Sequence, residues 1–373
     1  MMYCRGRKRK LMITNTPANR KKPTVEKSTI WHPGDDDRKY SHHAAICRFH
    51  NALYAAWSSG VTDEDMPGQC VMYSCSDDGV SWGKAKYLFE PMGKGVLTCG
   101  GFFNSGIFGA TEKLVAYAGY YEYISGTFTP CTEHTATTLL CRTSEDGQHW
   151  SEVIDLKLPF VPNTAPQVMP DGGLLMCGNI SFAVSDRNDG VSGWRMIALP
   201  PYGDNLKYDD SCSICEMKQF REDGMFLCEA SVFEKSGKLT ALLRSAGKYL
   251  YSCESTNGGR TWTYPQETRF TDSNSKVFCG TLPDGRAFVI SDPDSEYCRL
   301  PLVLALSEDG ENFCEQYVLA YQIVPMRYPE KYKGGYYAYP CAFIDDGVMR
   351  IICSVNKEDI ICLSVALSEL TGQ

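Results

Sequence analysis

Long apolar segments are missing from this sequence. Its 373 residues contain no stretch of about 18 apolar residues, which a membrane-spanning helix needs, so we expect no contact with a membrane. The first 27 residues are basic and polar, and their short stretch LMIT falls below the roughly 7–15 apolar residues of a secretory signal. We therefore expect a cytoplasmic protein in which residues 1–27 form a disordered lead-in to a single domain over residues 28–373.

A strongly basic surface and a metal-binding cysteine pattern are also missing. The net charge of −8 argues against nucleic acid as the main partner. Many of the 18 cysteines lie in apolar, strand-like runs, where they act as small hydrophobic residues. Cys212 and Cys215 are closely spaced, but no second Cys or His pair stands at metal-ligand spacing. We expect no metal, no disulfide framework and a reducing environment.

A sustained apolar period of 3.6 residues is missing as well, so long helices are not expected. Instead, one hairpin pattern recurs: a strand, a turn that usually carries Gly or Asp, and an apolar strand. Asp-Gly between alternating apolar runs is a strong hairpin signal. Six copies, spaced by about 60 residues, fill the chain after its lead-in and are centred on Leu53, Leu114, Leu174, Leu239, Phe288 and Met349.

A second pattern falls later in most of these units and reads Ser-x-Asp-Gly-x-x-aromatic. In such a turn the Asp or Asn side chain bonds its own backbone, the Gly adopts a positive φ, and the aromatic ring packs under the turn. We assign these turns a structural role and no chemistry. Four clear copies begin at Ser76, Ser144, Ser255 and Ser307.

These turns resemble the Asp boxes of the sialidase superfamily, and the resemblance covers about residues 30–370. It implies an all-β fold, a six-bladed β-propeller of four-stranded antiparallel blades. The six hairpin repeats predict the same architecture, since each repeat supplies one blade.

A propeller arranges the innermost strands of its blades around a central channel, so equivalent positions in those strands form a ring. We locate this ring by counting ten residues back from each hairpin marker, or twelve in the short fifth unit. Its members are all polar or ionisable, which favours a ligand site; a ring of water-bonded channel residues is the alternative. The predicted ring consists of His43, Asn104, Thr164, Glu229, Lys276 and Tyr339. We expect Asn104 and Lys276 to bind substrate.

Two ring members can form a nucleophile pair. Glu229 lies in an apolar run, and across the ring it can take the phenolic proton of Tyr339. The order Glu229, Arg244, Arg299, Tyr339 is similar to the catalytic half of the sialidase pattern. This resemblance implies that Tyr339 and Glu229 are the nucleophile pair, and that Arg244 and Arg299 bind a substrate carboxylate. An inter-blade salt bridge is the alternative role for each Arg.

The first blade departs from the family pattern. Where sialidases carry an Arg-Ile-Pro motif, this chain has His42 and His43, so one of three carboxylate-binding arginines is missing. A His can bind a carboxylate when it is protonated, or act as an acid or base near neutral pH. We expect both to contribute to substrate binding, although the sequence leaves open which of them faces the channel.

The loop after the next strand carries a cluster of acidic residues. The resemblance implies that one of them is the general acid/base, and Asp65 is favoured slightly over Asp63, with Glu64 as a further candidate. A solvated acidic cluster is the alternative. Gln69, in the same loop, is expected to line the pocket.

The leading functional hypothesis is a sialidase-like retaining exo-glycoside hydrolase that removes a terminal acidic sugar, sialic acid or a related one, and needs no cofactor. Its partner is then a glycan, with no nucleic acid and no membrane. One alternative is a lyase or hydrolase that uses His42 or His43 with a Tyr on glycans containing uronic acids. The other alternative is a non-catalytic carbohydrate-binding propeller.

Overall fold

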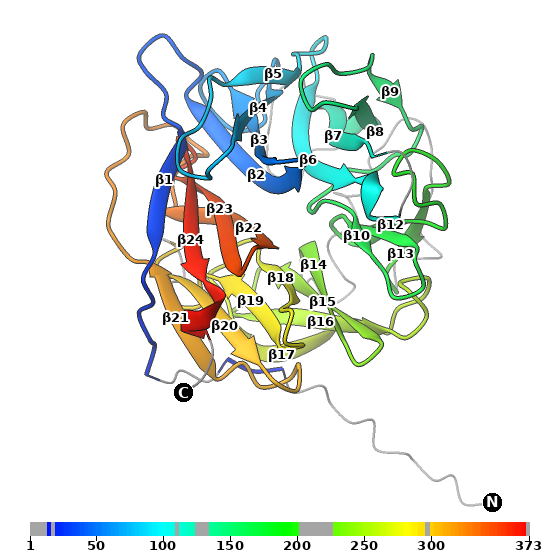
Figure 1. Cartoon of the computed structure of the whole chain (residues 1–373), viewed down its shortest axis with the longest axis vertical. Coiled ribbons are helices and arrows are strands. Elements are labelled where there is room, and N and C mark those ends of the chain that lie inside the picture. Colours follow the sequence, from blue (N-terminus) through cyan, green and yellow to red (C-terminus); the bar gives the residue numbers. More distant parts are fainter. Residues whose placement is uncertain are drawn as a thin grey trace, which may run out of the picture.

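The apolar hairpins of the sequence build six four-stranded sheets around a common axis (Figure 1). The computed structural model describes residues 13–15, 19–108, 112–123, 134–200, 227–294 and 299–370. The strand pairs within these sheets are antiparallel. The predicted fold, an all-β six-bladed propeller of four-stranded antiparallel blades, is therefore confirmed.

Each of the first five blades uses four consecutive strands, and its first strand is the innermost. Blade one contains β2 (Tyr40–Phe49), β3 (Ala52–Gly60), β4 (Cys70–Ser76) and β5 (Lys86–Phe89). Blade two contains β6 (Val96–Asn104), β7 (Leu114–Tyr123), β8 (His134–Ser144) and β9 (Ile154–Asp155). Blade three contains β10 (Gln167–Val168), β11 (Leu174–Cys177), β12 (Ser181–Ser185) and β13 (Arg195–Ala198).

The other three blades repeat this plan. Blade four contains β14 (Leu227–Lys235), β15 (Lys238–Ser245), β16 (Tyr249–Ser255) and β17 (Gln266–Thr271). Blade five contains β18 (Phe278–Thr281), β19 (Ala287–Ser291), β20 (Leu302–Ser307) and β21 (Glu315–Ala320). Blade six contains β22 (Tyr337–Asp345), β23 (Val348–Val355), β24 (Asp359–Ala366) and, from the start of the chain, β1 (Glu26–Trp31).

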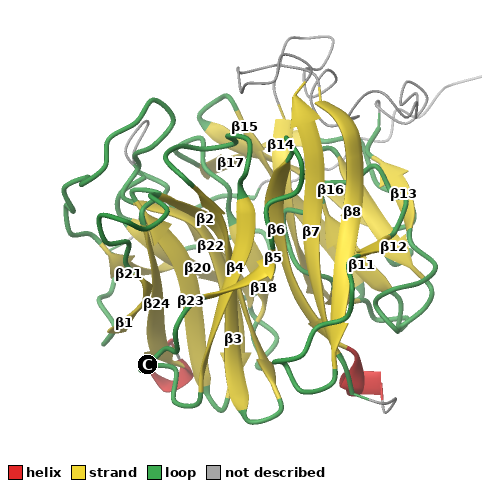
Figure 2. Cartoon of the chain, turned by 90° about the horizontal axis from the view of Figure 1, so that it is seen from above, coloured by secondary structure: helices red, strands yellow, loops and turns green. Residues whose placement is uncertain are grey.

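The ring closes by pairing both ends of the chain in one blade. β1 lies antiparallel to β24, with Glu26 opposite Ser364 (Figure 1). Within the described ranges, the helical elements are two short 3-10 helices, η1 (Ser105–Phe108) and η3 (Leu367–Leu370). No helix in these ranges is long and apolar enough to cross a membrane. Figure 2 shows the blades edge-on, with the connecting loops at their two ends.

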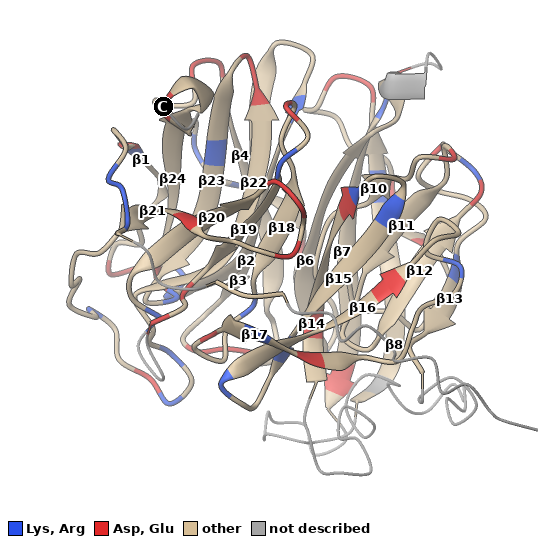
Figure 3. Cartoon of the chain, turned by 90° about the horizontal axis from the view of Figure 1, so that it is seen from below, with Lys and Arg blue, Asp and Glu red and all other residues tan. Residues whose placement is uncertain are grey.

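Apolar side chains on both faces of the blades pack between neighbouring sheets. This explains why so many strands are nearly continuous apolar runs instead of alternating ones. Figure 3 shows that acidic and basic residues are interspersed over the loops and turns in view. The largest fully buried aromatic side chains include Trp57, Tyr117, Phe182, Phe233 and Tyr317.

The repeated Asp-Gly turns join the third and fourth strands of a blade and have the predicted structural role. In the first, Ser76 Oγ accepts the Gly79 N–H at 2.8 Å, and Asp78 Oδ1 accepts the Ser81 N–H at 2.7 Å. Gly79 has a φ of 75°, which disfavours any side chain. These backbone hydrogen bonds lower the pKa of Asp78 to about 2. The Asp78 carboxylate therefore stabilises its own turn, as the sequence pattern predicts.

Part of the predicted lead-in belongs to the propeller. Ile13 is fully buried and packs in one cluster with Phe233, Phe270 and Phe313 of blades four and five. Asn15 Oδ1 accepts the Thr271 N–H at 2.9 Å. The expectation of a disordered segment up to residue 27 is therefore wrong for residues 13–15 and 19–27, because Ile13 packs in the core and the backbone of Lys21 pairs with blade five, its N–H donating to Gln316 O at 2.9 Å.

Candidate active site

Three predicted ring residues lie at one level of the channel because their strands share a distortion. His43, Glu229 and Tyr339 each lie near the start of an inner strand, at an irregularity in its register. They have φ values of 50°, 43° and 56°, in the left-handed region. A β-bulge re-aims a side chain in this way, and a strained residue of this kind costs about 1–3 kcal/mol. The rings of His43 and Tyr339 meet edge to face at 4.9 Å.

Tyr339, Glu229 and Arg244 form one hydrogen-bonded group. Arg244 Nη1 donates to Glu229 Oε2 at 2.7 Å and to Tyr339 Oη at 2.8 Å. Burial alone would raise the pKa of Glu229, but the Arg244 charge and a hydrogen bond from Tyr339 bring this pKa down to about 2. Burial and the Glu229 charge raise the pKa of Tyr339 well above its usual value. The group therefore holds a neutral phenol beside an ionised carboxylate.

Arg299 covers the Tyr339 ring, with its guanidinium carbon 5.3 Å from the ring centre. Its Nη1 is buried and has no hydrogen-bond partner among the described residues. Arg244, by contrast, already donates to Glu229 and Tyr339, and through Nε to Asn274 at 2.7 Å. Arg299 thus has the unsatisfied donor that an incoming carboxylate needs.

His42 and His43 flank the same phenol ring as neutral groups. The His42 ring centre lies 4.0 Å from that of Tyr339. Ser354 Oγ donates to Ala338 O at 3.3 Å and therefore accepts the Nδ1 hydrogen of His42 at 2.7 Å. Burial lowers the pKa of His42 well below its usual value and the pKa of His43 to about 3. Neither imidazole supplies the positive charge of the missing arginine at neutral pH.

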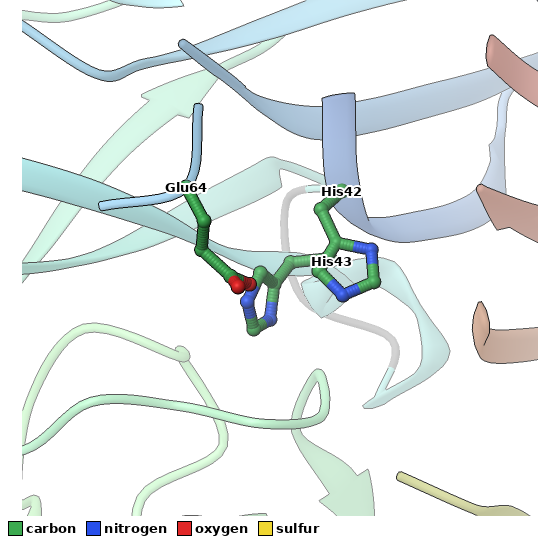
Figure 4. A group of neighbouring side chains, drawn as sticks. All are labelled: His42, His43 and Glu64. Carbon is green, nitrogen blue, oxygen red and sulfur yellow. The ribbon is translucent and has the colours of Figure 1, made fainter. Parts of the chain in front are cut away.

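His42, His43 and Glu64 also stand at a spacing that suits a metal ion (Figure 4). One ligand atom of each lies within 4.8 Å of the others. Glu64 is already paired with Lys357, whose Nζ lies 2.5 Å from Glu64 Oε2. The charges of Lys357 and Arg299 reach the His42 ring and lower its pKa further. A divalent cation would be repelled by these two groups, so the residues fit a metal poorly and we assign none.

Asp65 is held by two tyrosines of blade two. Tyr121 Oη donates to Asp65 Oδ1 at 2.9 Å, and Tyr123 Oη donates to Oδ2 at 2.8 Å. Gln69 Oε1 accepts the Asp65 N–H at 3.0 Å and so shapes the loop. Burial and the Glu64 charge raise the pKa of Asp65 to about 6, although the tyrosine hydrogen bonds act in the opposite direction. A carboxyl group with this pKa can both donate and accept a proton near pH 6.

Asp63, the other acidic candidate, ties two loops together. Its Oδ1 accepts the Glu64 N–H at 2.8 Å and its Oδ2 accepts the Tyr332 N–H at 3.1 Å. Asp63→Ala is expected to lower the free energy of unfolding by about 1–3 kcal/mol, because two backbone donors lose their acceptor. We expect kcat to fall less than about tenfold, below the 10²–10⁴-fold effect of a catalytic acid. Urea unfolding and initial rates check this, and a 10²-fold loss of kcat with normal stability would assign the acid role to Asp63.

Asn104 does not lie at ring level, and its assignment to the ring is wrong. It is the last residue of β6, opposite Leu114, and its Nδ2 donates to Glu112 Oε1 at 2.9 Å. The connection from β6 to β7 contains η1, so a count of ten residues back from Leu114 ends near the hairpin. In this blade the extra residue of the bulge is Gly100.

Lys276 lies inside the channel, where it was expected. It is 3% exposed, its Nζ donates to Asn163 O, and this nitrogen lies 5.5 Å from the centre of the Tyr339 ring. Thr164, also in the predicted ring, is buried and accepts the Cys177 N–H at 3.3 Å. The closely spaced pair Cys212 and Cys215 lies outside the described residues.

The sequence did not identify three residues that contact Glu64 or His42 in the site. Lys357, in the turn between β23 and β24, neutralises Glu64. Tyr40 Oη donates to the same carboxylate at 3.2 Å. Ser354 sets the tautomer of His42. None of these stands in a motif, so only the assembled propeller identifies them.

Comparisons with known proteins agree with this architecture. The family model of a BNR repeat-like domain matches residues 51–350. The chain belongs to the BNR repeat-like domain family. No curated protein matches it in sequence. The family assignment covers all six hairpin markers predicted from the repeat.

Solved structures share the fold of this BNR repeat-like domain at low sequence identity. A sialidase aligns with a TM-score of 0.64 and 17% identity over 93% of this chain, which spans 33% of that protein. The NanB sialidase from Streptococcus pneumoniae aligns with a TM-score of 0.64 and 11% sequence identity. The alignment covers 92% of this chain and 71% of the NanB chain. A protein of unknown function from Dyadobacter fermentans aligns with a TM-score of 0.64 and 14% sequence identity. The alignment covers 92% of this chain and 99% of the Dyadobacter protein. The predicted resemblance to sialidases is confirmed at the level of fold and repeat.

Proposed function

We propose that this protein is a retaining exo-glycosidase of the sialidase type that removes a terminal acidic sugar, sialic acid or a related one, from a glycan. The observation that carries the proposal is the group in which Arg244 Nη1 bonds both Tyr339 Oη and Glu229 Oε2, at 2.8 and 2.7 Å. Sialidases are the glycosidases that use a Tyr nucleophile. The similar sialidase folds support the proposal.

In the first step the sugar carboxylate binds Arg299, whose Nη1 lacks a partner among the described residues. Tyr339 Oη then attacks the anomeric carbon while Glu229 takes the phenolic proton. Because the pKa of Glu229 is about 2, this proton moves as the carbon–oxygen bond forms and not before. Protonated Asp65 gives its proton to the departing glycosidic oxygen. The products are a glycosyl–Tyr339 intermediate and the shortened glycan.

In the second step the Asp65 carboxylate removes a proton from water, which attacks the same carbon. The bond to Tyr339 breaks and its oxygen takes the proton back from Glu229. Two displacements at one carbon retain the anomeric configuration. Tyr40 lies between the two groups, which supports a common pocket: its hydroxyl donates to Glu64, the neighbour of Asp65, at 3.2 Å, and its ring centre lies 6.1 Å from that of His42, which packs on Tyr339 at 4.0 Å.

The test uses a fluorogenic α-sialoside and a panel of glycans with other terminal acidic sugars. We expect release of the acidic sugar, with NMR showing the α-anomer as the first product. A new ultraviolet absorbance on uronate oligosaccharides would instead indicate a lyase. Binding without turnover across the panel would indicate a carbohydrate-binding propeller, and either result would overturn the proposal.

The pH profile of kcat/KM tests Asp65 as the acid. Activity is expected to fall as pH rises through about 6, because the acid must be protonated and burial sets its pKa at about 6. Tyr123→Phe removes a hydrogen bond that lowers this pKa, so the fall should move to higher pH. Tyr54→Phe is the control. It removes a tyrosine hydroxyl that donates to the backbone oxygen of Asp146 in a turn, and it should leave the pH profile unchanged. A profile in Tyr123→Phe that matches the wild type would exclude Asp65.

A further inference from the structure

A small cavity lies inside the channel at the level of the ring. Residues from five of the six blades line it, including His43, Gly100, Thr164, Lys276 and Cys341. Its volume is about 10 Å³, which leaves room for one particle of about the size of a water molecule. The catalytic proposal does not use this space.

Lys276 brings a positive charge to the cavity without a matching negative charge. The residue is 3% exposed, and its Nζ donates to the backbone oxygen of Asn163. Among the described residues, no carboxylate forms an ion pair with it. Burial lowers the pKa of Lys276, so its charged form needs a compensating anion; the Glu229 charge acts in this direction, but Glu229 is already bound to Arg244 at 2.7 Å. Buried lysines are rare unless they are paired, because an isolated buried charge is strongly unfavourable.

Other polar groups around the cavity can donate hydrogen bonds. His43 Nδ1 is buried and has no partner in the described part of the chain, and a neutral imidazole can carry its hydrogen there. Thr164 Oγ1 accepts the Cys177 N–H at 3.3 Å, and its rotatable hydroxyl hydrogen can turn either to the Cys177 thiol or into the cavity that Thr164 lines. Burial raises the pKa of Cys99 to about 12, so this thiol stays protonated and adds no negative charge.

We propose that the cavity binds one monatomic anion, chloride in the cell, held by the Lys276 ammonium with His43 Nδ1 and Thr164 Oγ1 as further donors. A halide neutralises the buried ammonium, whereas a water molecule only accepts a hydrogen bond from it. The small volume, about 10 Å³, suits a single atom better than a polyatomic anion such as phosphate or sulfate, or the carboxylate of a sugar. The ion is thus a structural component of the propeller and not a substrate group.

Bromide provides a direct test on the unaltered protein. Crystals of the full chain, grown without chloride and soaked in sodium bromide, should show a bromine anomalous peak in contact with Lys276 Nζ. A cavity that contains only water, with no anomalous peak, would overturn the proposal. This result would not depend on whether the protein hydrolyses any glycan.

Thermal unfolding in chloride and in gluconate at equal ionic strength provides the second test. Chloride should raise the Tm of the wild type by about 2 °C or more, because an ion that binds only the folded state stabilises it. Lys276→Met should lose this difference. Lys235→Met is the matched control, since Lys235 Nζ also donates to a backbone oxygen, that of Gly285, but lies at a blade-four hairpin. The same chloride dependence in all three proteins would refute the site; if Lys276→Met does not fold, the bromide experiment decides alone.

Discussion

Tyr339→Phe is expected to lower kcat by at least about 10³-fold while the protein stays folded. The substitution removes one atom, the Oη that accepts from Arg244 at 2.8 Å and bonds Glu229. Arg244 keeps Glu229 and Asn274 as acceptors, so the free energy of unfolding should change by only about 1 kcal/mol. Rates on a fluorogenic α-sialoside and thermal unfolding of the same samples check both statements.

Tyr317→Phe is the matched control for this experiment. Tyr317 is buried in blade five, and its hydroxyl donates to Glu315 Oε1 at 2.6 Å, away from the ring. Loss of this hydroxyl should leave kcat unchanged within about twofold. If Tyr339→Phe instead keeps more than about a tenth of the wild-type kcat, Tyr339 is not the nucleophile and the covalent mechanism is wrong.

The fold could be predicted because the repeats are specified by local contacts. The turn from Ser76 to Ser81 closes through hydrogen bonds between residues two or three positions apart. Such a turn leaves the same signature in each blade whatever surrounds it. The position of Ile13 could not be predicted in this way, because its contacts with Phe233 and Phe313 join segments far apart in the chain.

The level of each ring residue depends on the length of the hairpin that follows it. A fixed count identified His43, Glu229 and Tyr339, whose inner strands all carry a bulge near their start. The same count failed for Asn104, because the second blade has a longer connection after its inner strand. Gly100, which has no side chain to attract attention, stands at the bulge of that blade.

The charge state of the first blade was the least predictable feature of the site. Two adjacent histidines could have replaced an arginine as cations, but His42 donates to Ser354, 312 positions away, and is fully buried. Burial keeps its ring neutral. The sequence shows which residues are present and not which of them are desolvated, and desolvation determines this charge.

Glu229→Gln is expected to have the second large effect, on both stability and activity. The buried Glu229 carboxylate is bound to Arg244 at 2.7 Å, and its pKa falls from the usual 4.5 to about 2. This shift corresponds to about 3 kcal/mol of stabilisation by the ionised form. The amide loses that charge and also cannot take the Tyr339 proton, so kcat should fall by about 10²–10⁴-fold. Glu254→Gln, which breaks the more exposed pair with Lys238, should cost less than about 1 kcal/mol and leave kcat unchanged.

The pH dependence of unfolding separates this ion pair from a general packing defect. Because the pKa of Glu229 is lower in the folded than in the unfolded protein, its contribution is complete above about pH 4.5 and is lost as pH falls toward about 2. The difference in unfolding free energy between wild type and Glu229→Gln should therefore be largest near neutral pH and shrink steadily below pH 4.5. Denaturant unfolding at pH 7 and at successively lower pH measures this difference. A deficit that stays constant over this range would show that the amide disturbs packing and that the Arg244 charge does not stabilise the carboxylate.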